Sequence, residues 1–151
     1  QKVSLSLAYL LATTLPFLIL KKMGKISDYE FTDRRERPPY FLSVSMLYGV
    51  LSLIVYGFQI PFLSEIALAL FLTSATISFI TLFWKISGHM TYSTLLFCTL
   101  AYLFSPYFFL LFLFSPFIGW SRIVLKKHTL LQVIGGTVVT FLICVLIYWV
   151  F

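Results

Sequence analysis

Six long apolar stretches dominate this sequence and rule out an ordinary water-soluble fold. They cover residues 3–20, 40–60, 62–84, 90–104, 107–123 and 129–151. A helix of about 20 apolar residues crosses the roughly 30 Å hydrocarbon core of a bilayer, and it satisfies its backbone hydrogen bonds internally. If the six stretches were β-strands instead, they could satisfy their backbone hydrogen bonds in a membrane only by closing into a barrel. The sequence therefore predicts an all-α fold, an integral membrane bundle of six transmembrane helices.

The composition agrees with a membrane environment. Hydrophobic residues make up 60% of the chain and charged residues 11%, whereas soluble domains average about 25% charged. Disordered chains lack the aromatic and β-branched residues that abound here. Cys98 and Cys144 lie inside apolar stretches without metal-ligand spacing, which favours a packing role. Because the chain has neither an internal repeat nor a long linker, we expect residues 1–151 to form a single membrane-embedded domain.

The formal net charge of +6 raises the question of the partner. A nucleic-acid-binding surface combines clustered Lys and Arg residues with aromatic side chains among them. Here the aromatic residues lie mainly inside the apolar stretches, apart from the basic residues. We therefore predict the lipid bilayer, with its anionic headgroups, as the partner and no nucleic acid. The sequence leaves the oligomeric state open.

The boundary between the fourth and fifth stretches depends on two Ser-Pro pairs. The apolar run from residue 90 to residue 120 is too long for one span, and only Ser105-Pro106 and Ser115-Pro116 interrupt it. Proline lacks the backbone donor that a helix interior needs, and it clashes with the preceding turn. We therefore predict a tight turn at Ser105-Pro106 and a kink within the fifth helix at Ser115-Pro116.

The polar segments that follow the first, third and fifth stretches fall on one face of the predicted bundle. Segments 21–39, 85–89 and 122–128 hold ten of the eleven basic residues, four of the five acids and both histidines. Lys and Arg are enriched in the cytoplasmic connections of membrane proteins. The sequence thus predicts an integral protein of the cytoplasmic membrane whose functional site lies at the cytoplasmic face.

Two of these segments carry residues suited to binding an anion. Ser87 is a good helix N-cap, Gly88 allows close backbone approach, and the unpaired N–H groups of a first helical turn attract anions. Arg122 can hold phosphate oxygens with two parallel hydrogen bonds, and His128 opens the sixth helix. Each feature alone also fits an ordinary cap or a side chain that reaches the headgroups. Because these residues occur together with His89 on one face, an anion-binding site is the favoured interpretation.

Ser87-Gly88-His89, and Ser121-Arg122 followed after five residues by His128, resemble the second and third motifs of the type 2 phosphatidic acid phosphatase family. That family shares its active site with glucose-6-phosphatase and the vanadium haloperoxidases. Its lipid-acting members have a six-helix membrane core, and the resemblance covers the whole chain. It implies a phosphate site built from Ser87, Gly88 and Arg122, with a phosphohistidine intermediate.

The first motif of the family is altered in this chain. That motif is a lysine, six further residues and then Arg-Pro; Arg37-Pro38 matches its end, whereas Glu30 occupies the lysine position. By resemblance Arg37 binds phosphate. The missing cation must come from another residue, and Arg34 is the best candidate, with Arg35 and Lys25 as alternatives.

The resemblance also assigns the reacting groups. His128 would be the nucleophile, and His89 the general acid for the leaving alkoxide. The aspartate that follows the nucleophile by four residues in the family is Gln132 here, and the proline before Ser87 is Ile86. A glutamine carbonyl can orient His128 and fix its tautomer but brings no charge. Gln132 could equally be an ordinary polar residue of a first helical turn.

These residues predict a metal-independent phosphatase without a cofactor, acting on a lipid phosphate monoester or an isoprenoid (di)phosphate. Phosphoryl transfer needs mainly positioning and charge neutralisation, which basic residues and a helix N-terminus supply. Two-metal chemistry needs clustered acids, whereas the acids of segment 21–39 lie among basic residues in a mutually neutralising run. The alternative is a catalytically degenerate relative that binds or moves a lipid phosphate without hydrolysing it, which Glu30 and Gln132 motivate.

Overall fold

A computed structural model of the chain describes residues 2–28, 31, 33–60 and 62–150, with side chains from residue 7 onward. The described residues form helices and the connections between them. They gather into two units, unit 1 (Gln1–Phe83) and unit 2 (Trp84–Phe151), which we describe separately. The long helical segments, at residues 2–22, 37–57, 63–83, 88–103, 106–124 and 130–150, begin and end within three residues of the predicted apolar stretches.

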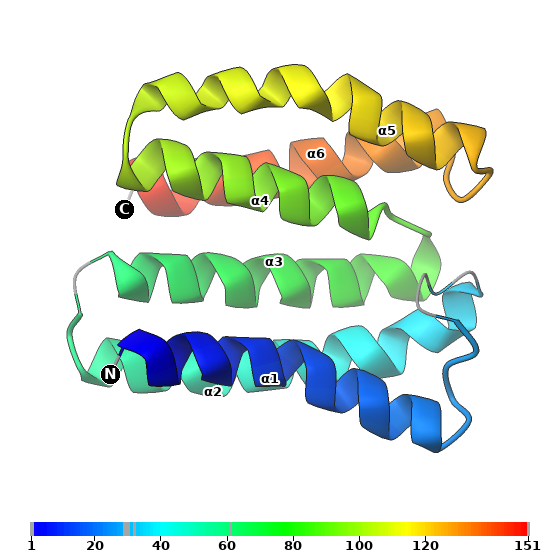
Figure 1. The fold of residues 1–151 in the computed structure, drawn as a ribbon, viewed down its shortest axis with the longest axis horizontal. Helices are drawn as coiled ribbons and strands as arrows, with labels where there is room; N and C mark the ends of the chain where they lie inside the picture. The colour runs from blue at the N-terminus through cyan, green and yellow to red at the C-terminus, as the bar shows by residue number, and fades with distance from the viewer. Residues whose placement is uncertain (1, 29–30, 32, 61, 151) are drawn as a thin grey trace. The chain divides into compact units, whose positions relative to one another are not determined.

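Unit 1 is built around its second long helix (Figure 1). Its elements are α1 (Lys2–Lys22), η1 (Arg34–Glu36), α2 (Arg37–Gly57) and α3 (Leu63–Phe83). Helix α2 packs against both α1 and α3. Ala12, Val44 and Tyr48 form a buried apolar cluster between α1 and α2. The charged connection of residues 23–33 joins these two helices and therefore lies at one end of the pair.

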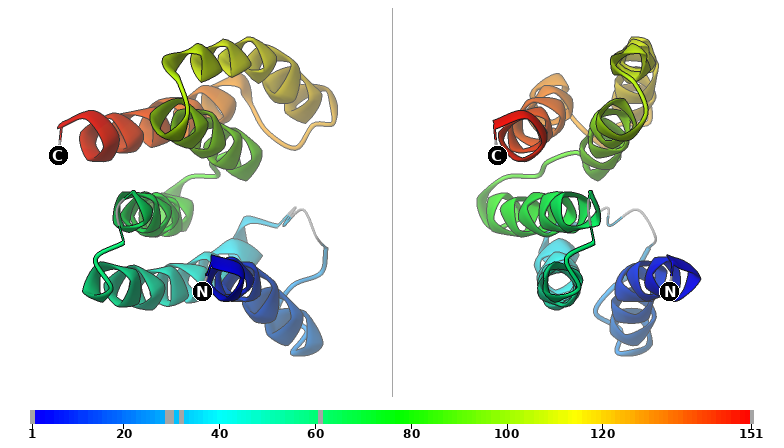
Figure 2. Two further views of the ribbon diagram at one scale, coloured as in Figure 1. Left: turned by 60° about the vertical axis from the view of Figure 1, so that its left-hand side comes forward. Right: turned by 90° about the vertical axis from the view of Figure 1, so that its left-hand side faces the viewer.

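Unit 2 is a second group of helices that pack side by side (Figure 2). Its elements are α4 (Gly88–Leu103), η2 (Pro106–Phe114), α5 (Ser115–Val124), α6 (Leu130–Val145) and the π-helical turn η3 (Leu146–Val150). Helix α4 packs closely on α6, because small residues face one another. Cys98 and Cys144 are both fully buried there, and a hydrogen bond joins their thiols. This placement agrees with a packing role.

The predicted break at Ser105-Pro106 is confirmed, since α4 ends at Leu103 and η2 begins at Pro106. Ser115-Pro116 does more than kink the fifth helix. It marks the change from the 3₁₀ winding of η2 to the α winding of α5. A 3₁₀ helix rises about 2.0 Å per residue against about 1.5 Å for an α-helix, so this segment reaches about 33 Å. The tighter winding gives a short sequence the length of a membrane span.

Four of the described helical segments are long and apolar enough to cross a membrane. They are Arg34–Gly57, Leu63–Phe83, Pro106–Val124 and Leu130–Val150. Large apolar side chains cover their outer surfaces: Leu53 is 74% exposed and Phe83 is 72% exposed. Such surfaces suit hydrocarbon rather than water. The chain is thus an all-helical membrane protein; α4, with 16 residues, measures only about 24 Å, and six transmembrane helices stay a prediction.

Candidate functional site

The N-terminus of α4 forms one wall of the candidate site. Ser87 is fully buried and caps the helix, because its Oγ accepts a hydrogen bond from the Met90 N–H at 3.5 Å. Gly88 and His89 follow as the first two helical residues. The N–H groups of this first turn have no partner within the helix, and they carry the positive end of the helix dipole. The cap therefore presents a local positive potential beside His89.

Two backbone contacts tie this cap to α6. The Ser87 N–H donates to the Gln132 carbonyl at 3.2 Å. One turn further along α6, Gly136 lies so close that a Cβ there would come within 2.8 Å of the Ser87 carbonyl oxygen. Gly135 packs in the same way against the Trp84 ring. The two glycines allow these close contacts, and Gly136 sets the approach of the Ser87 cap.

The connection between α5 and α6 forms the opposite wall. Lys126 has a left-handed backbone, with φ 53°. Its N–H donates to the Ile123 carbonyl at 2.9 Å, and the Lys127 N–H donates to the Arg122 carbonyl at 3.0 Å. These two bonds define a Schellman ending, which reverses the chain at the end of a helix. The reversal places His128 beside Arg122, whose carbonyl also accepts the His128 N–H at 3.2 Å.

Arg122 connects the two walls of the site. Its Nη1 lies 3.4 Å from Nε2 of His89, while its backbone carbonyl holds His128. A guanidinium has only donors, so Nε2 of His89 must be the acceptor in this contact. This contact is a hydrogen bond only in the neutral imidazole that carries its proton on Nδ1. A phosphate bound by Arg122 would lie next to His89.

Gln132 fixes the orientation and the tautomer of His128. Its Oε1 lies 3.1 Å from Nδ1 of His128 and 3.2 Å from the Thr129 backbone nitrogen. Because the Thr129 N–H can only donate, the side-chain atom of Gln132 that faces it is the oxygen, and Nδ1 of His128 must also donate to that oxygen. In the neutral imidazole this leaves the lone pair on Nε2 of His128, which is the form that a nucleophile needs.

The same glutamine caps α6. The Thr129 Oγ1 accepts the Gln132 N–H at 3.4 Å, while the Gln132 side chain accepts the Thr129 N–H, a complete capping box. Gln132 is therefore both a capping residue of the first turn of α6 and the side-chain partner of His128. Our sequence analysis missed the role of Thr129, although Thr-x-x-Gln before an apolar run is a known signature of this motif.

The structure brings together six of the eight predicted site residues. All six lie in unit 2, at the end that holds the α5–α6 connection (Figure 1): Ser87, Gly88, His89, Arg122, His128 and Gln132. The other two, Arg34 and Arg37, lie in unit 1. Arg34 donates from Nη1 to the Leu82 carbonyl near the end of α3 at 3.0 Å. Arg37 is buried and donates from Nε to the Phe31 carbonyl at 2.9 Å. Glu30 lies outside the described residues.

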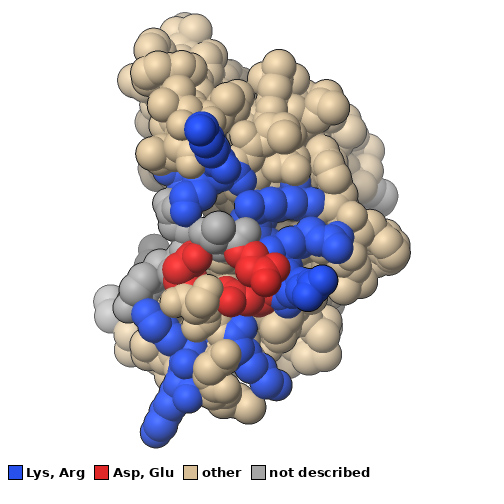
Figure 3. Space-filling model, turned by 90° about the vertical axis from the view of Figure 1, so that its right-hand side faces the viewer, with Lys and Arg blue, Asp and Glu red and all other residues tan. Residues whose placement is uncertain are grey.

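The acids of the α1–α2 connection serve the local fold. Asp33 accepts the Arg35 N–H at 2.9 Å as the cap of η1, and Glu36 accepts the Ser27 N–H at 3.0 Å. Figure 3 shows Asp and Glu side chains gathered among Lys and Arg side chains. Within the described part of the chain, no group of three or more His, Cys, Asp or Glu side chains could hold a metal ion.

Comparisons with known proteins leave the family open. No protein-family model, no curated protein and no solved structure matches the chain at a significant level. The likeness to the type 2 phosphatidic acid phosphatases therefore stays a prediction from the sequence motifs.

Proposed function

We propose that the protein is an integral membrane phosphatase that hydrolyses a lipid phosphate monoester or an isoprenoid (di)phosphate without a metal. The contact of Arg122 with both histidines carries this proposal. Its guanidinium lies at the His89 imidazole, and its carbonyl holds the His128 backbone. A phosphoryl group held by that guanidinium would lie next to His89, the proposed acid, while the Arg122 carbonyl keeps the backbone of His128, the proposed nucleophile, in the same connection. Geometry of this kind supplies the positioning on which phosphoryl transfer depends.

The proposed reaction has two balanced steps. In the first, Nε2 of His128 forms a bond to phosphorus while the phosphorus–oxygen bond to the lipid breaks, and a protonated His89 gives its proton to the leaving oxygen. In the second, water attacks phosphorus, its proton passes to His89, and the nitrogen–phosphorus bond breaks. Because His89 accepts from Arg122 in the structure, the guanidinium must turn to the phosphate before His89 takes up its proton.

Charge neutralisation in this proposal comes from the chain itself. Arg122 and the first turn of α4 bind the phosphoryl oxygens, and a low dielectric at headgroup depth strengthens both interactions. The Gln132 carbonyl orients His128 but cannot stabilise its cation, so we expect slow turnover. That deficit also motivates the second candidate function, in which the protein binds or moves a lipid phosphate without cleaving it.

Release of inorganic phosphate by the purified protein is the direct test. We expect detergent-solubilised protein to release phosphate from at least one lipid of a panel of phosphatidic acid, a phosphatidylglycerophosphate-like lipid and an isoprenoid diphosphate. EDTA should leave the rate unchanged, because no step uses a metal. Saturable binding of these lipids without phosphate release would support the second candidate function. Release that stops with EDTA and returns with a divalent cation would refute the proposed mechanism.

The proposal places the site at the cytoplasmic face of the cell membrane. Lys126 and Lys127 flank the site without a role in the reaction, and Lys126 occupies a left-handed position that glycine adopts more easily. A lysine there has no conformational benefit, which favours retention for its charge. A reporter active only in the cytoplasm should therefore give a signal when fused after Lys127. A silent fusion there, with a signal from a fusion at Ser105, would reverse the orientation.

A further inference from the structure

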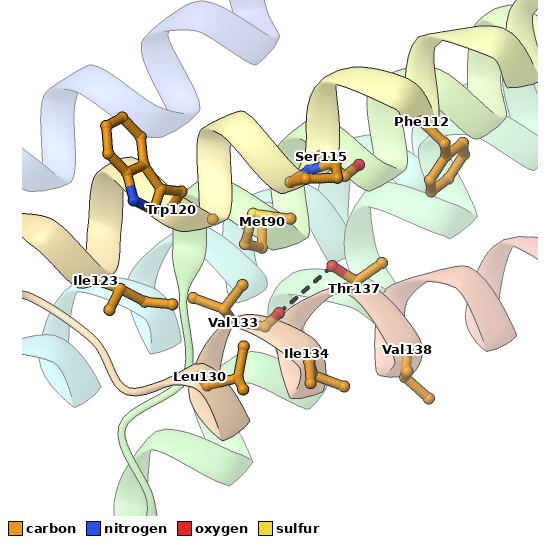
Figure 4. Close-up of a pocket in the computed structure, with 12 residues that line it drawn as sticks. Met90, Phe112, Ser115, Trp120, Ile123, Leu130, Val133, Ile134, Thr137 and Val138 are labelled. Carbon is orange, nitrogen blue, oxygen red and sulfur yellow. Dashed lines mark hydrogen bonds between the residues drawn. The ribbon is translucent and has the colours of Figure 1, made fainter.

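An apolar groove runs along unit 2 between α5 and α6. It has a volume of about 530 Å³, within the range of small-molecule pockets. In Figure 4 the side chains of α5 and α6 face each other across it, with Met90 of α4 between them. The polar side chains in its lining are Ser115 and Thr137. Such a groove offers little to a polar ligand and suits a hydrocarbon chain.

The groove begins at the candidate site. Met90, Ile123 and Val133 line it, and each directly follows a site residue in the sequence: His89, Arg122 and Gln132 respectively. The phosphate-binding groups and the apolar lining therefore come from neighbouring positions on the same three helices. A ligand with a phosphate at Arg122 and an apolar part next to it can occupy both.

The dimensions of the groove match part of a lipid chain. On α6 its lining extends from Leu130 to Val138, a rise of about 12 Å at 1.5 Å per residue. The two helices approach closely beneath it, since a Cβ on Gly119 would come within 2.7 Å of Val133. Trp120, two residues before Arg122 in α5, belongs to the lining, and an indole ring is favourable at the depth where headgroups meet chains.

We propose that this groove binds a hydrocarbon chain of a phosphate-headed amphiphile whose phosphate lies at Arg122, an inference that rests on the proposed function. Charge complementarity selects the occupant. The candidate site presents Arg122 and the positive end of α4. A lipid with an exposed anionic phosphate therefore gains binding free energy both from its headgroup and from its hydrocarbon chain. A zwitterionic lipid of the same chain length gains binding free energy only from its chain in the groove. The groove therefore contributes to selection of the substrate. Its contacts with the bound chain come in addition to those that any bilayer lipid makes with the protein surface.

Photocrosslinking tests the location independently of turnover. The probe is phosphatidic acid with a diazirine in the middle of one chain, and the control is phosphatidylcholine with the same chain. We expect crosslinks of the phosphatidic acid probe to concentrate on groove residues such as Ile134 and Val138, and Arg122→Gln should remove that preference. Equal crosslinking patterns for both headgroups, spread over the outer surface, would refute the proposal.

Kinetics test the contribution of the groove to catalysis. Ile134→Phe partly fills the groove, whereas Leu142→Phe adds the same ring on α6 outside the lining. We expect Ile134→Phe to lower kcat/KM about tenfold or more for a long-chain substrate, with little change for a short-chain soluble one. Leu142→Phe should leave both unchanged. If Ile134→Phe lowered kcat/KM equally for the long-chain and the short-chain substrate, the proposal that the groove binds the hydrocarbon chain would be refuted.

The two proposals fail in different ways. If no lipid phosphate is hydrolysed but crosslinking depends on the phosphate headgroup, the groove stands and hydrolysis is refuted. If hydrolysis occurs and crosslinking does not depend on the headgroup, hydrolysis stands and the groove is refuted.

Discussion

Replacing His128 with alanine is expected to reduce phosphate release below detection. The proposed reaction forms a covalent bond to Nε2 of this imidazole, and water cannot occupy the same position with the same geometry. The measurement is release of labelled phosphate at saturating lipid. Alkaline quenching should also trap label on the peptide containing His128 in the wild type and none in His128→Ala.

Variants of the neighbouring residues separate the roles within the site. His89→Ala should lower kcat by about 10²–10⁴-fold, the usual contribution of a general acid. Gln132→Ala should leave measurable activity, because an orienting hydrogen bond is partly replaceable. Gln132→Glu keeps a capping residue and adds the missing negative charge, so its turnover should equal or exceed that of the wild type. Full activity in His128→Ala would refute the assignment of the nucleophile.

The sequence predicted most of the fold because its main signal is hydrophobicity over long stretches. Polar segments and the Ser105-Pro106 pair end the apolar runs, and these features located every helix. The winding of the helices was not predictable in the same way. Residues 106–114 form a 3₁₀ helix and residues 146–150 a π turn, yet both segments are almost uniformly apolar. Hydrophobicity alone does not distinguish the three windings, which differ in backbone hydrogen bonding.

For the site, the sequence predicted which residues meet in unit 2 but not how they are held. The role of Ser87 as an N-cap followed from known capping preferences, whereas the capping box that Thr129 forms with Gln132 was missed. The Schellman ending at Lys126 was not predictable, because this position usually favours glycine and lysine carries no such signal. The dual role of the Arg122 residue also required the structure, since it joins a side-chain contact and a backbone contact from distant parts of the chain.

Gly136→Ala is expected to impair both turnover and stability. The new Cβ would lie 2.8 Å from the Ser87 carbonyl oxygen and 3.2 Å from Met90 Cβ. A backbone oxygen cannot rotate away as a side chain can, so α4 must move away from α6 and carry His89 with it. A displacement of about 1 Å at a catalytic group costs roughly 10²-fold in rate, and overpacking costs about 1–3 kcal/mol of stability. Phosphate release and thermal unfolding in detergent measure the two effects.

Two other glycines provide matched controls for this effect. A Cβ on Gly57 in α2 would meet nothing within 4 Å, so Gly57→Ala should leave turnover unchanged and raise stability by up to about 1 kcal/mol through helix propensity. A Cβ on Gly135 would meet only the Trp84 ring, which can shift without moving the Ser87 cap. Gly135→Ala should therefore lose stability but less turnover than Gly136→Ala. If Gly136→Ala retained wild-type turnover, the spacing between Ser87 and α6 would not control the site, and the catalytic geometry would have to depend on the Arg122 connection alone.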